Sequence, residues 1–216
     1  MNKFWKDSLR VVGTVFIAAN LLAPQLPAQN DWPPDSGFRV YSTTITNDSV
    51  MPISTIYNNV SNGVNTCSAN GAPGGNESPE LYWTGAPANT KTFVVVLYDV
   101  TAAFTHWGMY NISGNASGLP ENAGVPKSQY GQQIVNDFEI GPEYDGPCPP
   151  ANVPPNVHHY VFTVYALSTV LQLPSSTNFP ANAERLYHAL IAAGRQQQIL
   201  ASASITGLYS STPTTK

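Results

Sequence analysis

Charged side chains are scarce in this sequence. Asp, Glu, Lys and Arg make up only 10% of the 216 residues, and the formal net charge at pH 7 is −4. This balance excludes the clustered Lys and Arg of a nucleic-acid-binding surface and a bulk electrostatic attraction to anionic membranes. The low charge does not indicate disorder, because 42% of the residues are hydrophobic and 11% are aromatic, which is enough for a packed core.

Motifs that mark several enzyme classes are also missing. The two cysteines do not form a C-x-x-C redox pair. The sequence lacks the H-E-x-x-H zinc motif and the G-x-S-x-G turn that carries a nucleophilic serine. It contains only four histidines. Any catalytic or metal site would therefore have to be assembled from residues that lie far apart in the chain.

No apolar run is long enough to span a bilayer, and the one that comes nearest lies close to the N-terminus. Residues 11–22 form an apolar stretch after three basic residues, which is the pattern of a signal peptide. Ala28 offers a small residue at a cleavage site. We therefore predict a signal peptide at residues 1–28 and one domain at residues 29–216, located in the periplasm or secreted. An uncleaved membrane anchor is the alternative.

The two cysteines are Cys67 and Cys148. An even number of cysteines in an exported chain favours a disulfide. The bridge would close a loop of roughly 80 residues, for which chain entropy predicts a stabilisation of about 4 kcal/mol. Two free thiols are the alternative.

The spacing of apolar residues predicts mostly β-structure. Short apolar or alternating runs are bounded by Gly, Pro, Asn and Ser, as is typical of strands joined by turns. The continuously apolar run at residues 93–98 indicates a central strand that is buried on both faces. We predict strands at residues 38–46, 81–83, 93–98, 107–112 and 160–167, and loops at residues 58–76 and 113–155.

Helical periodicity is confined to one segment near the C-terminus. Residues 182–193 place Leu186, Leu190 and Ala193 on one face, and Gly194 is expected to end the helix. Residues 199–209 are predicted to form a turn of helix followed by a last strand.

Polar residues stand where the predicted strands begin or end. Asp99 follows one strand, His106 precedes the next, and His158 and Tyr160 open a third. Because strand ends can share one rim of a sheet, we expect these side chains to meet in a pocket. Imidazoles and a phenol can donate hydrogen bonds to an anion, and we expect Asp99 to favour protonated imidazoles.

A fourth segment, Tyr-Asp-Gly-Pro-Cys-Pro-Pro at residues 144–150, completes the predicted pocket. Tyr144 could donate a hydroxyl to the ligand, and Pro150 would belong to a rigid wall without donors. His159 alternates away from His158 and Tyr160 on a strand, so it should point elsewhere.

These segments, in this order, resemble the phosphatidylethanolamine-binding proteins, in the bacterial branch often called Raf-kinase-inhibitor-like. The resemblance extends from about residue 66 to residue 209. It is carried by residues 78–83, 93–99, 106–107, 111–112, 144–150, 158–162, 165–167 and 201–209.

The resemblance implies a mostly β fold, an antiparallel β-sandwich of the family type with one main C-terminal helix. It places Asp99, His106, Pro150, His158 and Tyr160 at an anion pocket. Two departures stand beside that pocket. The family usually has Pro-Asp-Ala-Pro after the pocket aspartate, where this chain has Val-Thr-Ala-Ala, and His159 replaces the usual arginine.

The expected function is non-catalytic binding of a small anion or a phospholipid head group, without a cofactor or a bound metal. A metal-dependent hydrolase that uses the His and Asp residues is one alternative. A protease-inhibitor-type interaction module is another, since family members are often described as inhibitors. The expected partners include no nucleic acid, and no membrane-spanning segment should remain after signal cleavage.

Overall fold

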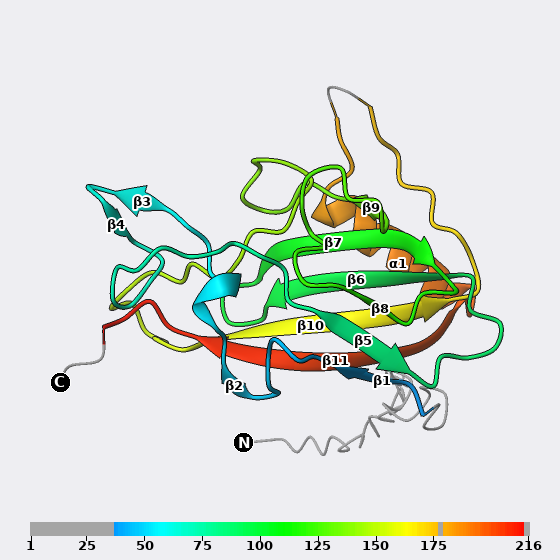
Figure 1. Cartoon of the computed structure of the whole chain (residues 1–216). Coiled ribbons are helices and arrows are strands. Elements are labelled where there is room, and N and C mark those ends of the chain that lie inside the picture. Colours follow the sequence, from blue (N-terminus) through cyan, green and yellow to red (C-terminus); the bar gives the residue numbers. More distant parts are fainter. Residues whose placement is uncertain (1–36, 177–178, 214–216) are drawn as a thin grey trace, which may run out of the picture. The chain divides into compact units, whose positions relative to one another are not determined.

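The continuously apolar run forms a strand at the centre of a six-stranded sheet (Figure 1). The computed structural model describes residues 37–176 and 179–213, so the predicted signal peptide and its cleavage site lie outside the described residues. The sheet order is β2-β11-β10-β6-β7-β9. The strands are β2 (Ser49–Val50), β6 (Thr92–Asp99), β7 (Phe104–Ser113), β9 (Gln132–Gln133), β10 (His158–Leu167) and β11 (Ile199–Tyr209).

Smaller elements surround this sheet. A three-stranded sheet has the order β1-β5-β8, and β3 and β4 form a separate hairpin. Figure 1 shows β5 and β8 on one side of the large sheet and α1 on the other. The bounds are β1 (Arg39–Tyr41), β3 (Val60–Ser61), β4 (Val64–Asn65), β5 (Leu81–Thr84), β8 (Gly118–Leu119), α1 (Ala183–Arg195) and a 3-10 turn at Ile53–Thr55.

The smaller sheet covers one face of β6 and α1 covers the other, which explains why β6 is apolar on both faces. Alternate side chains of a strand point to opposite faces of the sheet. Phe93, Val95 and Leu97 belong to the core shared with the smaller sheet. Val94 and Val96 belong to a second core, which α1 closes. The prediction of a central strand buried on both faces is therefore confirmed.

The helix was also located correctly. Asn182 caps it by accepting a hydrogen bond from the backbone N–H of Arg185 at 3.1 Å. Leu186, Leu190 and Ala193 are buried, as the periodicity indicates. Gly194 does not end the helix. The helix continues to Arg195, and Gln197 takes the left-handed conformation, with φ 55°, that usually follows a helix end.

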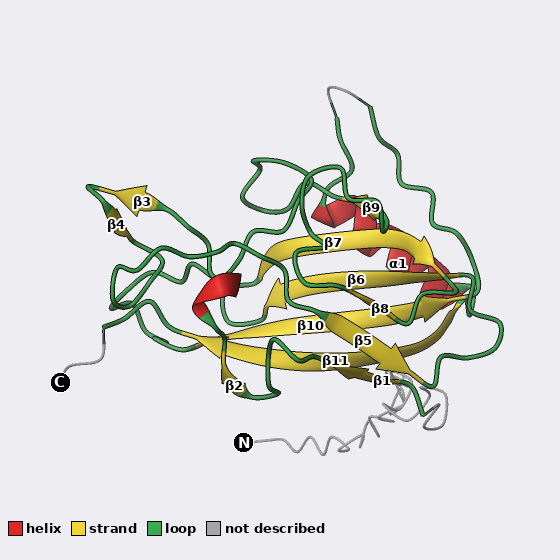
Figure 2. Cartoon of the chain, viewed as in Figure 1, coloured by secondary structure: helices red, strands yellow, loops and turns green. Residues whose placement is uncertain are grey.

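A mostly β fold with one main C-terminal helix is confirmed (Figure 2). The expectation of purely antiparallel pairing is wrong at one edge, where β2 pairs with β11 in parallel. Only Ser49 and Val50 make this pairing, with Gly207 and Leu208. A pairing of two residues is too short to leave an apolar pattern in the sequence.

Two strand predictions needed correction. The segment 38–46 gives only a three-residue strand, because Ser42 Oγ accepts the backbone N–H groups of Thr44 and Ile45 and so turns the chain. Residues 199–209 contain no helical turn and form the single long strand β11. Its pairing with β10 along its whole length overrides the local helical preference.

The predicted loop at residues 58–76 contains the hairpin β3–β4. Its turn is Asn62-Gly63, and both residues have positive φ, 52° and 79°. Asn-Gly is the preferred sequence of such two-residue turns, because both positions need left-handed backbone. This dipeptide was the signal that could have predicted the hairpin.

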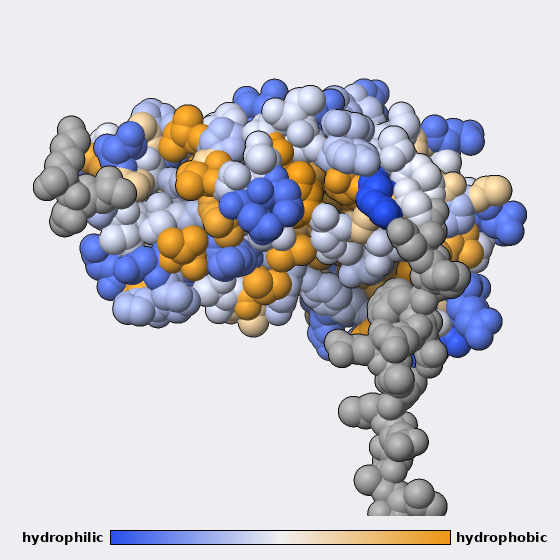
Figure 3. Space-filling model, turned by 90° about the horizontal axis from the view of Figure 1, so that it is seen from below, coloured by the Kyte–Doolittle hydropathy of each residue, from blue (hydrophilic) through white to orange (hydrophobic). Residues whose placement is uncertain are grey.

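Across residues 37–176 and 179–213, no helix combines the length and the apolar character needed to cross a bilayer. On the face drawn in Figure 3, hydrophobic residues lie in small patches among hydrophilic ones. Scattered apolar residues of this kind are ordinary at a protein surface.

Candidate functional site

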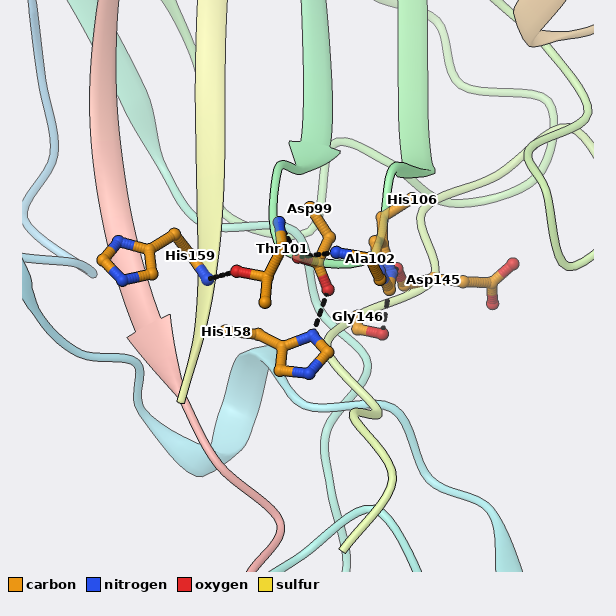
Figure 4. Close-up of polar contacts among 8 residues, drawn as sticks. All are labelled: Asp99, Thr101, Ala102, His106, Asp145, Gly146, His158 and His159. Atoms are coloured by element: carbon orange, nitrogen blue, oxygen red, sulfur yellow. Dashed lines mark hydrogen bonds and ion pairs between the residues drawn. The ribbon is translucent and has the colours of Figure 1, made fainter. Parts of the chain in front are cut away.

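Three strands of the large sheet bring polar residues to the same end. β6 ends at Asp99, and the antiparallel register places Tyr160 of β10 opposite it. On the other side of β6, Phe104 of β7 lies opposite Asp99. His158 opens β10 and His106 follows Phe104 by two residues, so both lie near this end. Figure 4 shows Asp99, His106 and His158 gathered there.

A cavity of about 160 Å³ lies at this end of the sheet. Five of the six predicted ligand-binding residues line it, namely Asp99, His106, Pro150, His158 and Tyr160. Its remaining wall consists of Ala102, Phe104, Phe138, Cys148 and Pro149. The site is therefore a small, mainly apolar hollow in which a few polar groups converge.

Asp99 and His158 form a buried pair. His158 Nδ1 lies 2.6 Å from Asp99 Oδ2, and the side chains are only 6% and 3% exposed. The other carboxylate oxygen accepts the backbone N–H groups of Thr101 and Ala102, at 2.8 and 3.1 Å. Asp99 is thus both a turn residue and a partner of His158. A carboxylate only accepts hydrogen bonds, so His158 Nδ1 carries a proton.

His106 is held in one orientation by backbone carbonyls. Its Nδ1 lies 2.9 Å from the carbonyl oxygen of Asp145 and 3.1 Å from that of Gly146. Carbonyl oxygens only accept, so Nδ1 is the donor and Nε2 holds the lone pair when the ring is neutral. Burial lowers the pKa of His106 to about 4. Asp99 favours the protonated ring, as expected, but burial outweighs it, so His106 is mainly neutral near neutral pH.

The surroundings of His106 explain this low pKa. Its ring packs against Phe104, Phe138 and Tyr160, with centroids 4.9, 5.4 and 5.2 Å away. These rings remove the water that would solvate an imidazolium. The carbonyl bonds and the charge of Asp99 favour the charged form, but the cost of burial is larger.

Tyr160 contributes a buried hydroxyl beside Asp99. The residue is fully buried, and its hydroxyl makes no hydrogen bond of standard geometry in the described part of the chain, although the Asp99 carboxylate lies near enough to interact with it as an acceptor. Burial and then the nearby Asp99 carboxylate raise the pKa of the phenol, so it keeps its proton. Buried hydroxyl groups without a partner are uncommon, and one that lines a cavity can serve a ligand.

Tyr144 is not brought to the cavity. Its hydroxyl donates to the carbonyl oxygen of Thr55 at 2.8 Å, and its ring packs edge-on against Trp107. The residue is 2% exposed and holds the 144–150 segment against the core. Its proposed role in ligand binding is replaced by a structural one.

The 144–150 segment is tied down at several points. The structure contains a disulfide between Cys67 and Cys148, with the two Cα atoms 4.5 Å apart. Gly146 N–H donates to Asn76 Oδ1 at 2.7 Å. A Cβ at Gly146 would lie 1.9 Å from the carbonyl oxygen of Thr55, so only glycine fits here. These ties fix the carbonyl groups that orient His106.

Neither departure from the family pattern lines the cavity. Of the four residues that follow Asp99, only Ala102 lines it, and this residue matches the alanine of the usual Pro-Asp-Ala-Pro. His159 is exposed and its ring points away from the site, as predicted from the strand alternation (Figure 4). Its backbone N–H donates to Thr101 Oγ1 at 3.0 Å and so fastens the turn that follows β6.

Two aromatic cavity residues were missed. Phe104 lies two positions before His106 on the same strand, so the alternation of β7 could have indicated it. Phe138 comes from the long irregular segment and carries no comparable signal. Among the described residues, no group of three or more His, Cys, Asp and Glu side chains is placed to hold a metal ion.

Comparison with known proteins agrees with this architecture. The family model described as phosphatidylethanolamine-binding protein matches residues 42–210. The chain belongs to the phosphatidylethanolamine-binding protein family. This finding confirms the resemblance that the sequence motifs indicate.

Individual members of this family give the degree of similarity. YbcL of Escherichia coli K12 is 35% identical over 149 residues, which cover 64% of this chain and 74% of that protein. A relative from Aquifex aeolicus is 38% identical over 137 residues, covering 61% of this chain and 73% of its own. The crystal structure of E. coli YbcL, described as a member of the mammalian PEBP family, superposes with a TM-score of 0.64 and 30% identity. It covers 80% of this chain and 98% of that one.

The low pKa of His106 predicts how stability depends on pH. The ring has a pKa of 6.5 when unfolded and about 4 when folded, so between these values the unfolded chain binds more protons. The contribution of His106 to the free energy of unfolding is therefore fully present above about pH 6.5. It decreases as pH falls towards 4, by about 3 kcal/mol in all.

Urea unfolding at several pH values between these limits measures the effect. His106→Gln, which does not titrate, serves as the comparison, and its stability should fall less over the same range. An equal loss in both proteins would show that His106 does not cause the pH dependence.

Proposed function

We propose that this chain is a non-catalytic binding protein whose cavity holds a phosphate-type anion, either free or as a phospholipid head group. The observation that carries the proposal is the convergence of the Asp99–His158 pair with the buried hydroxyl of Tyr160 on one small cavity. A buried donor without a hydrogen bond of good geometry favours a ligand that accepts one.

His158 supplies the charge. Its Nδ1 is engaged by Asp99, so protonation of the ring places the second N–H at Nε2, which makes no hydrogen bond within the described residues. A charge-assisted hydrogen bond to an oxyanion is stronger than a neutral one. The negative charge of Asp99 limits the net charge of the site, which suits a singly charged ligand better than a highly charged one.

The size of the cavity supports a small ligand. Sites for drug-sized molecules usually enclose about 300 to 1,000 Å³. A volume of about 160 Å³ fits a head group or a free anion, and any acyl chains of a lipid would have to lie outside.

The composition of the walls supports binding without catalysis. Apart from Tyr160, whose phenol is kept protonated, the cavity-lining set contains no hydroxyl, thiol or lysine nucleophile. Cys148 contributes as half of the disulfide.

We also propose that the protein works after export, in the periplasm or outside the cell. The N-terminal pattern of residues 1–28 and the disulfide of the structure support this proposal, because disulfides persist in oxidising compartments.

Titration calorimetry with inorganic phosphate and with phosphoethanolamine tests the function. We expect weak binding of both ligands, because a small site with few hydrogen-bond donors holds an anion with limited free energy. His158→Ala should weaken binding roughly tenfold to a hundredfold, because it removes one charge-assisted hydrogen bond.

His159→Ala is the matched control, since this neighbour on the same strand points away from the cavity and should leave the affinity unchanged. A free phosphate site would bind both ligands equally, whereas a head-group site would prefer phosphoethanolamine. Absence of anion binding, together with stoichiometric zinc binding that strengthens as pH rises, would replace the proposal with the metal-dependent alternative.

A further inference from the structure

The polar groups of the cavity differ in whether they can donate or accept a hydrogen bond. Tyr160 provides one donor, and His158 provides another when its ring is protonated. His106 can offer only an acceptor, because its one proton is committed to the carbonyl groups of Asp145 and Gly146. Its Nε2 makes no hydrogen bond inside the described ranges, and the ring lines the cavity.

An oxyanion without a proton fits this arrangement poorly. Its oxygens accept hydrogen bonds from Tyr160 and His158, but an oxygen near His106 Nε2 would bring two lone pairs together. The ligand would then cover this acceptor and leave it without a partner. A group that carries one hydroxyl satisfies all three positions, because that hydroxyl donates to Nε2 while its other oxygens accept.

Resting on the function proposed above, we propose that His106 makes the cavity selective for an oxyanion that keeps a proton, such as a phosphate monoester with one P–O–H, over an equally charged oxyanion without one. His106 is a specificity-determining residue in this proposal. The hydroxyl of the ligand takes the place of a protein donor that the cavity lacks.

The charged groups around His106 do not supply that donor. Asp99 accepts from His158 and from its own turn, and Asp137 accepts the Thr105 N–H at 2.7 Å. The carboxylate of Asp145 accepts from Asn136 Nδ2 at 2.8 Å on the far side of the segment. All three are acceptors, so they cannot reverse the preference. A pKa of about 4 leaves His106 mainly neutral at about pH 5.

Methyl phosphate and methyl sulfate are the matched probes. At about pH 5, methyl phosphate carries one negative charge and one hydroxyl, because the second pKa of a phosphate monoester is about 6. Methyl sulfate has a similar shape and the same charge but no proton. Calorimetric titration of the full chain should show methyl phosphate binding roughly tenfold to a hundredfold more tightly, which is the effect of leaving one buried acceptor unpaired.

Two variants assign the preference to His106. In His106→Gln, the amide N–H can still donate to the Asp145 and Gly146 carbonyls while its oxygen accepts from the ligand, so the preference should persist. In His106→Leu, no acceptor remains, and the two probes should bind within about threefold of each other, which is less than one hydrogen bond.

The outcomes separate this inference from the proposed function. Equal binding of both probes by the unaltered protein would overturn the proposed selectivity but would still support an anion site. This result does not depend on whether any variant folds. Tighter binding of methyl sulfate would also overturn it. If neither probe binds, both the proposed function and the inference fail. A preference that survives in a folded His106→Leu variant would assign the selectivity to another residue.

Discussion

Replacing both Cys67 and Cys148 with serine is expected to lower the free energy of unfolding by about 4 kcal/mol. The two residues are 81 positions apart, so the bridge removes a large loop from the unfolded ensemble. The destabilisation arises mainly in the unfolded state. Without the bridge the unfolded chain gains conformational entropy, and this gain is larger when the bridge closes a longer loop. For a domain with ordinary marginal stability, this is a large fraction of the total.

Urea unfolding of the oxidised protein, the reduced protein and the double variant measures this effect. The reduced protein and the variant should have the same midpoint, well below that of the oxidised protein. Complete alkylation of both thiols in folded, unreduced protein would show that the bridge does not form. The single variants are less suitable, since each leaves one reactive thiol.

The bridge should also matter for the cavity. Cys148 lies in its wall beside Pro149 and Pro150, and the carbonyl groups of the same segment orient His106. We therefore expect reduction to loosen the wall and the ring together, because Cys148 is covalently tied to a residue that is distant in the sequence.

The sequence carried enough information to place most of the site because strand ends are easy to recognise. Asp99, His106 and His158 each border an apolar run, and antiparallel neighbours bring such ends to one rim. The alternation of side chains along β10 also correctly predicted that His159 points away from the face that carries His158 and Tyr160. Much of the rest of the fold followed from the same periodicity. It failed where Ser42 turned the chain, at the short parallel pairing of β2, at the hairpin β3–β4 and at the start of β11.

The protonation state of His106 could not be predicted in this way. It depends first on burial of the ring, to which Phe138 in an irregular segment contributes. The position of its proton depends on two carbonyl groups that lie 39 and 40 positions further along the chain. Tyr144 failed for the same reason, because its partner is the Thr55 carbonyl 89 positions away. Local patterns identify which residues can act, whereas long-range contacts decide what they can donate or accept.

Asp99→Ala is expected to destabilise the protein by about 3 kcal/mol, because it removes the acceptor of three hydrogen bonds that contribute about 1 kcal/mol each. The carboxylate is 3% exposed and serves three groups at once. It accepts from His158 Nδ1 and from the backbone N–H groups of Thr101 and Ala102. Its loss leaves the imidazole without its partner and opens the turn between β6 and β7.

Asp99→Asn separates these two roles. The amide oxygen can still accept from the turn, so the loss of stability should be smaller than with alanine. The amide nitrogen then faces His158 and can only donate, which makes Nδ1 the acceptor and moves the proton of the neutral ring to Nε2. The neutral ring then carries its N–H at Nε2 beside the cavity, so Asp99→Asn should retain phosphate binding.

Urea unfolding and phosphate titrations of both variants measure these effects, and the nitrogen chemical shifts of His158 report its tautomer. A double-mutant cycle with His158→Ala isolates the coupling between the pair. If Asp99→Ala costs less than about 1 kcal/mol, the pair contributes no more than an exposed ion pair does. In that case the Asp99–His158 hydrogen bond would be too weak to hold His158 in place for anion binding.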